Sequence, residues 1–283
     1  MAKESKSSKQ AASKPQKSTP TPVKVYLVAY NALSAVGWAY VLTLVAIHLF
    51  DLDGKSGSFT AVPKSTTSFF SRILPFLDSK TGAVQSNLPP WLKPIHTRAT
   101  TTYGRAGAAT AFVQSFAALE VLHAALGWVR SPVPTTAMQV ASRLFLVWGI
   151  MAQFTGVRTN ALFASMVFAW SFTEVIRYTF YALNLLGYNP PFLLWLRYTT
   201  FYILYPLGAG SEAFLMYFTL PDAAPITLAH SIPTLTGAWS LGDYGRAILF
   251  TIWWPGLYFM YTYMISQRRK VLGPAKPPKT KSS

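Results

Sequence analysis

Six apolar stretches alternate with polar segments along the chain, and they cover residues 25–50, 105–129, 136–154, 160–186, 192–218 and 247–265. A helix needs about 20 predominantly apolar residues to cross the hydrocarbon core of a bilayer, and each stretch approaches or exceeds that length. The pattern therefore predicts an all-α polytopic membrane protein built as a bundle of six transmembrane helices.

The composition favours a membrane protein over a soluble domain. Hydrophobic residues make up 51% of the chain and charged residues only 12%, against about a quarter in soluble domains. The net charge is +16, but lysines are concentrated in the two tails, so we expect no nucleic-acid partner. Basic tails beside apolar spans mark the cytosolic side of a membrane, and six spans place both tails there. The absence of Cys excludes disulfides, thiolate metal sites and Cys nucleophiles.

The same pattern divides the chain into three parts. Residues 1–24 are rich in Ser, Lys, Pro and Gln and are predicted to be a disordered, basic cytosolic tail. Residues 25–266 form the membrane domain, which contains a long loop at 51–104, and residues 267–283 form a second basic cytosolic tail. Within the loop, residues 69–77 are apolar but too short to span a bilayer, which suggests an interfacial helix.

Three of the four Glu residues lie inside apolar stretches: Glu120, Glu174 and Glu212. Carboxyl groups are unfavourable within a membrane and indicate a functional site by default. The alternative is that each one pairs with an Arg and locks helices together, an interpretation with even support for Glu120. It has less support for Glu212, which has no Arg within two turns of its own helix.

Polar side chains from four predicted helices fall on the cytosolic side of this topology. They are Glu120, His123 and Arg130, then Arg143, then Arg177 and Tyr178, and finally Arg197 and Tyr198. Glu174 lies at helical spacing from Arg177 and Tyr178, and therefore on the same face. The arrangement predicts a pocket that opens to the cytosol. For Arg130, Arg143 and Arg197, simple snorkelling to the interface is an equally good interpretation.

The fifth stretch carries the candidate chemistry. Tyr198, Tyr205, Gly208 and Glu212 fall within one broad stripe, and Pro206 is expected to disturb the helix beside Tyr205. The His residues lie on separate elements, so no metal site is predicted. Proton transfer by a Tyr and a buried carboxyl group remains, and such a pair suits the elimination of water beside a carbonyl.

Six motifs in this order resemble the very-long-chain (3R)-3-hydroxyacyl-CoA dehydratases, also described as protein tyrosine phosphatase-like proteins. They are Tyr30-Asn-x-x-Ser-x-x-Gly37-Trp38, Leu119-Glu120-x-x-His123-x-x-x-Gly127, Val129-Arg130-Ser131-Pro132, Gln139-x-x-Ser142-Arg143, Trp170-Ser171-x-x-Glu174-x-x-Arg177-Tyr178, and Leu196-Arg197-Tyr198 through Tyr205-Pro206 to Ser211-Glu212. The resemblance covers residues 26 to about 270 apart from the loop at 51–104, which looks like an insertion.

The resemblance implies an endoplasmic reticulum membrane enzyme with Tyr205 and Glu212 as its catalytic residues. It would convert 3-hydroxyacyl-CoA to trans-2-enoyl-CoA in the third of four elongation steps, without a cofactor. Its expected partners are the lipid bilayer, the condensing enzyme and the two reductases. Phosphatase chemistry is excluded because Ala124 holds the place of the nucleophilic Cys. Lys279 and Lys281 resemble a dilysine signal for retrieval to this membrane, which is read from the cytosol.

The spacing of the two catalytic candidates leaves their roles open. In a regular helix Tyr205 and Glu212 are roughly 10 Å apart along the axis, too far for both to reach neighbouring carbons. Either Pro206 and Gly208 shorten the gap, or Glu212 acts through Tyr205 or a water, so Tyr205 is assigned the direct proton transfer. The arginines at 130, 143 and 197 are candidates for the CoA phosphates. A non-catalytic scaffold and a membrane lipid isomerase are the competing hypotheses.

Overall fold

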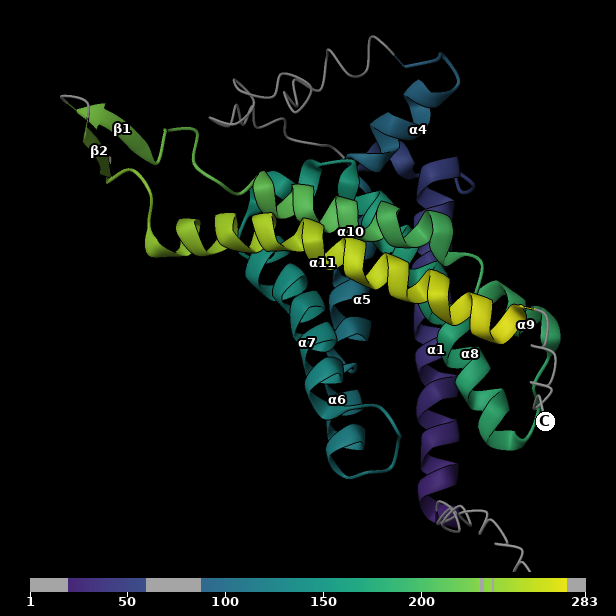
Figure 1. Cartoon of the computed structure of the whole chain (residues 1–283). Helices are drawn as coiled ribbons and strands as arrows, with labels where there is room; N and C mark the ends of the chain where they lie inside the picture. The colour runs from purple at the N-terminus through teal and green to yellow at the C-terminus, as the bar shows by residue number, and fades with distance from the viewer. Residues whose placement is uncertain (1–19, 60–87, 230–231, 236, 274–283) are drawn as a thin grey trace, which may run out of the picture.

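The structure is a computed structural model that describes residues 20–59, 88–229, 232–235 and 237–273. Helices account for almost all of it (Figure 1). They are α1 (Thr21–Phe50), α4 (Leu92–Ala99), α5 (Thr102–Ser115), α6 (Ala118–Ala125), α7 (Val133–Leu144), α8 (Leu162–Leu186), α9 (Pro191–Arg197), α10 (Phe201–Tyr217) and α11 (Leu241–Leu272). Two short 3₁₀ turns, η1 (Ser56–Ser58) and η4 (Thr155–Thr159), and a π-helical turn, η3 (Phe145–Met151), connect them. The all-α class is confirmed.

A helix or a pair of consecutive helices occupies each of the six predicted stretches. The second stretch is divided between α5 and α6, and the third consists of α7 continued by η3. The fifth is interrupted at residues 198–200, between α9 and α10, where sequence alone predicts one continuous span. Hydrophobicity does not distinguish a straight helix from two helices joined by a tight turn, because both bury the same side chains.

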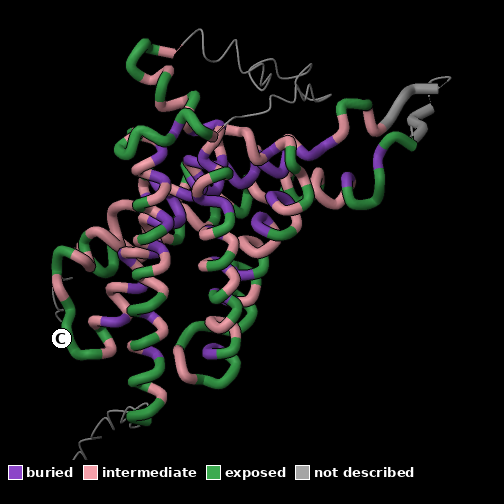
Figure 2. The backbone as a smooth tube through the Cα atoms, turned by 180° about the vertical axis from the view of Figure 1, so that it is seen from behind, coloured by how far each residue is buried: buried purple, intermediate pink, exposed green. Residues whose placement is uncertain are grey.

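The helices cross in two directions (Figure 1). The long helix α1 packs along α8 and α5, and α10 packs on α8 and on α11. Figure 1 shows α10 and α11 side by side and lying across α1, α6 and α7 rather than along them. The core lies where these directions meet, and it contains Trp38, Val45, Ile150, Trp170 and Met216 (Figure 2).

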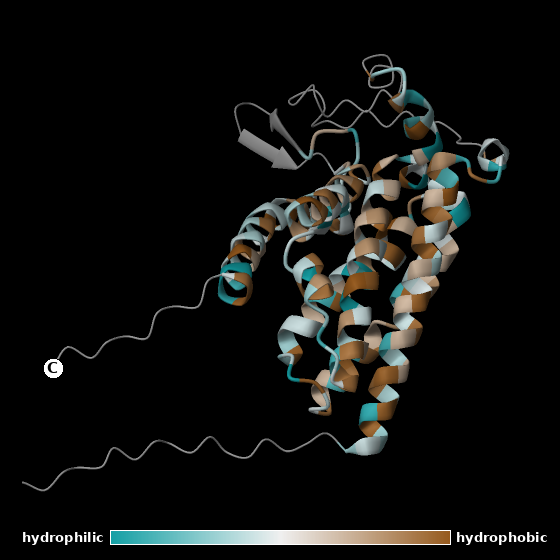
Figure 3. Cartoon of the chain, turned by 90° about the vertical axis from the view of Figure 1, so that its right-hand side faces the viewer, coloured by the Kyte–Doolittle hydropathy of each residue, from teal (hydrophilic) through white to brown (hydrophobic). Residues whose placement is uncertain are grey.

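Hydrophobic residues recur along the long helices, including at positions on the outside of the fold (Figure 3). Leu33, Val36, Phe112 and Ile203 are among the large hydrophobic residues that are mostly exposed. Two helical segments, Thr21–Phe50 and Thr102–Ala125, are long and apolar enough to cross a membrane. The α10 helix is too short for this criterion, and α8 and α11 carry charged and aromatic polar residues that lower their hydropathy. Candidate membrane spans are thus present, but fewer than the predicted six meet the criterion.

Several boundaries differ from those predicted. The α1 helix begins at Thr21, inside the expected tail 1–24, and α11 continues to Leu272, inside the expected tail 267–283. Part of the loop at 51–104 is ordered as η1 and α4. An antiparallel hairpin that the sequence did not suggest, β1 (Ile226–Ala229) and β2 (Ile232–Leu235), precedes α11. The predicted interfacial helix at 69–77 and the dilysine signal lie outside the described residues.

Candidate functional site

An ion-pair network joins α6, α7 and α8 at the centre of the predicted polar cluster. Arg143 of α7 pairs with one oxygen of Glu174, and the Nε of Arg177 donates to the other at 2.5 Å. Arg177 also donates to both oxygens of Glu120, at 2.9 and 2.7 Å, and the Tyr178 hydroxyl donates to the same carboxylate. Glu174 is 2% exposed, so its charge is neutralised almost entirely by these two arginines.

This network bears on the two interpretations of the intramembrane carboxylates. Glu120 and Glu174 each pair with cations on other turns or helices, as the helix-locking interpretation predicts, whereas their predicted place in a substrate-binding site stays a prediction. Removing Arg177 would leave the Glu120 carboxylate without its cation, and the loss of a partner by a buried charge destabilises a fold strongly. The network therefore fixes α6 and α7 against α8.

His123 lies against aromatic rings from the start of α1. The Tyr26 hydroxyl is 2.9 Å from His123 Nε2, and the Tyr30 ring centroid is 4.8 Å from that of His123. The ring centroids of Tyr30 and Tyr178 are 6.0 Å apart, and this contact links the aromatic group around His123 to the ion-pair network. Tyr26 and Tyr30 were not site candidates, although their spacing of four residues on α1 is the signal that places them on one face.

Glu212 has a different environment from the other two carboxylates. It is 9% exposed, and the indole Nε1 of Trp170 donates to its Oε1 at 2.6 Å. Among the ion pairs of the described residues, none involves Glu212. The Arg143 guanidinium carbon lies 5.0 Å from the Trp170 ring centroid, so this indole stands between Glu212 and the cationic network.

Small residues allow α10 to approach α8 closely enough for this hydrogen bond. A Cβ on Gly208 would lie 3.3 Å from the Cβ of Ala169, and the hydroxyls of Ser165 and Ser211 are 2.7 Å apart. Small side chains at helix contacts are the usual means of close packing within membranes. Trp170 lies in a motif of the sequence but was missed as a site residue, because its contact with Glu212 depends on this crossing.

Tyr205 occupies the same face of α10 as Glu212, two turns earlier. Its ring is half-buried and stacks on Tyr261 of α11, with centroids 6.5 Å apart and planes 17° apart. The expectation that Pro206 would disrupt the helix is wrong, because α10 is helical from Phe201 to Tyr217. The axial separation of roughly 10 Å is therefore retained.

The remaining candidates lie at the edges of this cluster. Arg197 donates to the Tyr181 hydroxyl at 3.0 Å and stacks against that ring, while its Nη1 is buried without a partner among the described residues. Tyr198 follows at the end of α9, with its ring 5.7 Å from the Arg197 guanidinium. Arg130 is exposed, beyond the end of α6. These three do not join the ion-pair network, whereas Arg143 does.

The fold and the site together define a helical protein with two candidate membrane spans and a buried carboxyl group among ion-paired helices. Residues 114–274 match the family model described as "Protein tyrosine phosphatase-like protein, PTPLA", which covers more than half of the chain. The chain belongs to this family. No solved structure gives a significant match.

Curated relatives carry a functional name. The chain is 41% identical over 255 residues to the Arabidopsis thaliana "Very-long-chain (3R)-3-hydroxyacyl-CoA dehydratase PASTICCINO 2", covering 89% of this chain and 95% of the relative. It is 49% identical over 161 residues to a Schizosaccharomyces pombe "Probable very-long-chain (3R)-3-hydroxyacyl-CoA dehydratase", covering 56% of this chain and 72% of the relative. A Caenorhabditis elegans dehydratase of the same name, hpo-8, is 33% identical over 263 residues, covering 89% and 96%.

Proposed function

We propose that this protein is a very-long-chain (3R)-3-hydroxyacyl-CoA dehydratase, a hydro-lyase that removes water from 3-hydroxyacyl-CoA to give trans-2-enoyl-CoA. The relatives that match it over most of their length carry that name. The observation that carries the proposal on the structural side is the environment of Glu212. It is buried and free of an ion pair within the described part of the chain, while the two neighbouring carboxylates are neutralised.

The reaction needs two proton movements. A proton leaves the carbon next to the thioester, and the hydroxyl on the following carbon takes up a proton and departs as water. Tyr205 carries out the direct proton transfer, since its hydroxyl is not held by a hydrogen bond to a described residue. Glu212 supports it across two helical turns, through a water or through the substrate itself, and Trp170 holds the carboxyl group in place.

Arg130 and Arg197 are the stronger candidates for the CoA phosphates. Arg143 is already committed to Glu174, so its charge is compensated within the protein. The Nη1 of Arg197 is buried and has no hydrogen bond to a described residue, so a phosphate oxygen that reaches it would not have to break an ion pair. Tyr198, at the end of the same short helix, lies beside this approach.

The proposal includes a setting in the cell. We place the enzyme in the endoplasmic reticulum membrane as a six-span protein with both termini in the cytosol, working with the condensing enzyme and the two reductases of fatty acid elongation. Two segments meet the length and hydropathy expected of spans. The basic tails follow the positive-inside pattern, which supports the same orientation.

Activity of the purified protein on a 3-hydroxyacyl-CoA tests the proposal. Tyr205→Phe and Glu212→Gln should each reduce turnover at least about 100-fold, the lower range for losing one acid–base group. Tyr258→Phe, at an exposed ring on α11, is the matched control and should keep full activity. Full activity in folded Tyr205→Phe protein would exclude its catalytic role, and an inactive wild type that still assembles with elongation enzymes would favour a scaffold.

A further inference from the structure

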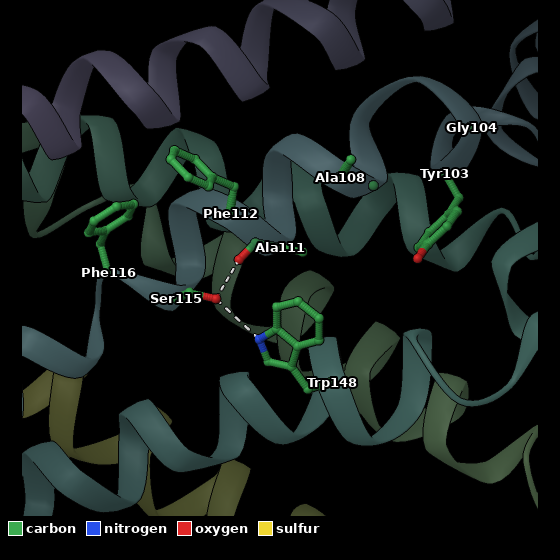
Figure 4. Close-up of a pocket in the computed structure, with 9 residues that line it drawn as sticks. Tyr103, Gly104, Ala108, Ala111, Phe112, Ser115, Phe116 and Trp148 are labelled. Carbon is green, nitrogen blue, oxygen red and sulfur yellow. Dashed lines mark hydrogen bonds between the residues drawn. The ribbon is translucent and has the colours of Figure 1, made fainter.

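A groove lies along α5, and none of the residues that line it is Tyr205, Glu212 or Trp170 (Figure 4). It has a volume of about 640 Å³ and lies between α5 and η3. Small residues of α5, including Ala108 and Ala111, and the rings of Phe112 and Trp148 line it. The Trp148 indole donates to Ser115 Oγ at 3.1 Å, which holds this ring in place.

A second cavity adjoins the first at the start of α5. Tyr103 and Gly104 line both, and the second has a volume of about 560 Å³. Its accessible surface is mostly apolar, like that of the first cavity, but Arg158 and five Ser and Thr residues line it: Ser58, Thr100, Thr101, Thr155 and Thr159. The hydroxyl groups of Ser58, Thr100, Thr101 and Thr159 donate to nearby backbone carbonyls. The two cavities adjoin and form one elongated site, and the end that carries Arg158 is called its polar part.

Among the described residues, Arg158 is the only charged one that lines this elongated site. Its Nε and Nη2 donate to the carbonyls of Met151 and Ala152, both at 2.7 Å. Its guanidinium carbon lies 5.0 Å from the Tyr103 ring centroid. Within the described residues no carboxylate pairs with it, and its Nη1 has no hydrogen bond. The polar part is therefore positively charged, and the two hydrogen bonds to backbone carbonyls hold the Arg158 guanidinium in a fixed orientation.

The position of the site on the helix matches the depth profile of a bilayer. The polar part lies at the first turn of a segment that is apolar enough to span, and the apolar part continues along it towards the middle. Gly104 is about 24 Å along the axis from Glu120, so the polar part lies at the opposite end of this segment from the ion-pair network. The groove extends from there to Phe116, about one helical turn from Glu120.

We propose that this elongated site binds one anionic glycerophospholipid of the surrounding membrane. The phosphate accepts from Arg158, and an acyl chain lies in the groove along α5. Guanidinium groups are well suited to phosphate oxygens. A groove open to lipid gains little from excluding water, because lipid tails are as apolar as its walls. The contact between the phosphate and Arg158 therefore determines which lipid is preferred, and the groove determines where the acyl chain lies.

Native mass spectrometry of the full chain, released from nanodiscs of phosphatidylcholine with a minor fraction of phosphatidylinositol, tests this inference. The wild type should retain one phosphatidylinositol. Ala108→Phe fills the groove at an exposed position and should lose it, whereas Ala118→Phe, exposed but outside the groove, should retain it. Arg158→Gln should lose the preference for phosphatidylinositol over phosphatidylcholine, and Arg158→Lys should keep it.

Three outcomes would overturn the inference. The first is equal retention of phosphatidylinositol by Ala108→Phe and wild type, provided that both have the same helical content and melting temperature. The second is displacement of the lipid from wild type by a 3-hydroxyacyl-CoA, which would make the groove a substrate subsite. The third is binding of inorganic phosphate alone, with no lipid retained. None of these depends on whether the protein is a dehydratase.

Discussion

Replacing Trp170 by Phe isolates the contact that distinguishes Glu212 from the other buried carboxylates. Phe keeps an aromatic ring under Arg143 but has no N–H to donate to Glu212 Oε1. A hydrogen bond to a charged group contributes about 1.5–3 kcal/mol. If that energy holds the carboxyl group in its working position, its loss should lower kcat roughly 10- to 150-fold. KM should change little, because Trp170 is not proposed to touch the CoA.

The smaller ring also leaves a void, and the void must be separated from the lost hydrogen bond. Trp38→Phe provides the control. Trp38 and Trp170 are both 2% exposed and belong to the same core cluster. No hydrogen bond joins Trp38 to a carboxylate in the described structure. Both substitutions should therefore lower the melting temperature similarly, whereas only Trp170→Phe should lower kcat.

The assay is steady-state turnover of a 3-hydroxyacyl-CoA by each purified variant, with the melting temperature measured in the same detergent. Wild-type kcat in Trp170→Phe would refute the reasoning, since Glu212 would then not need this donor. Equal losses of kcat in both Trp variants would also refute it, because packing and not the hydrogen bond would be the cause.

Three further substitutions test other parts of the structure. Arg177→Met should destabilise the fold by about 3 kcal/mol, which is the low end for a broken buried ion pair because the Arg177 side chain is 27% exposed. Arg130→Met is the control: Arg130 is exposed, so this substitution should have no measurable effect on thermal unfolding. Gly208→Leu should overpack the α8–α10 contact, lower stability by about 1–3 kcal/mol and abolish turnover, whereas Gly210→Leu has open space around its Cβ and should be tolerated. Asp53 lies beyond the end of α1, and its hydrogen bond with the Arg105 guanidinium lowers its pKa to about 2. A carboxyl group with a lowered pKa in the folded state stabilises the fold fully above about pH 4, and this stabilisation is lost as the pH falls from about 4 towards about 2. Asp53→Asn should therefore flatten the decline in melting temperature between about pH 4 and about pH 2.

Much of the site could be read from residue types and helical spacing. Glu174, Arg177 and Tyr178 lie on one face of α8 as predicted, and the structure brings Glu120, Arg143 and His123 to that same region. Spacing within one helix is enough for such predictions, because α-helical geometry is nearly invariant. The helical backbone around Pro206 was not predictable in this way, since the packing of α10 against α8 and α11 compensates for a missing backbone donor.

The sequence by itself determined the all-α class, the six helical stretches and the scarcity of carboxyl groups within them. These follow from local periodicity and composition, which need no knowledge of neighbours. Only the tertiary structure decided which carboxyl groups are neutralised. Glu120 and Glu174 find guanidinium partners, whereas Glu212 finds an indole, because the crossing of α10 over α8 brings Trp170 to it rather than an Arg. Charge compensation is a property of contacts between helices, and those contacts depend on crossing geometry that no single helix encodes.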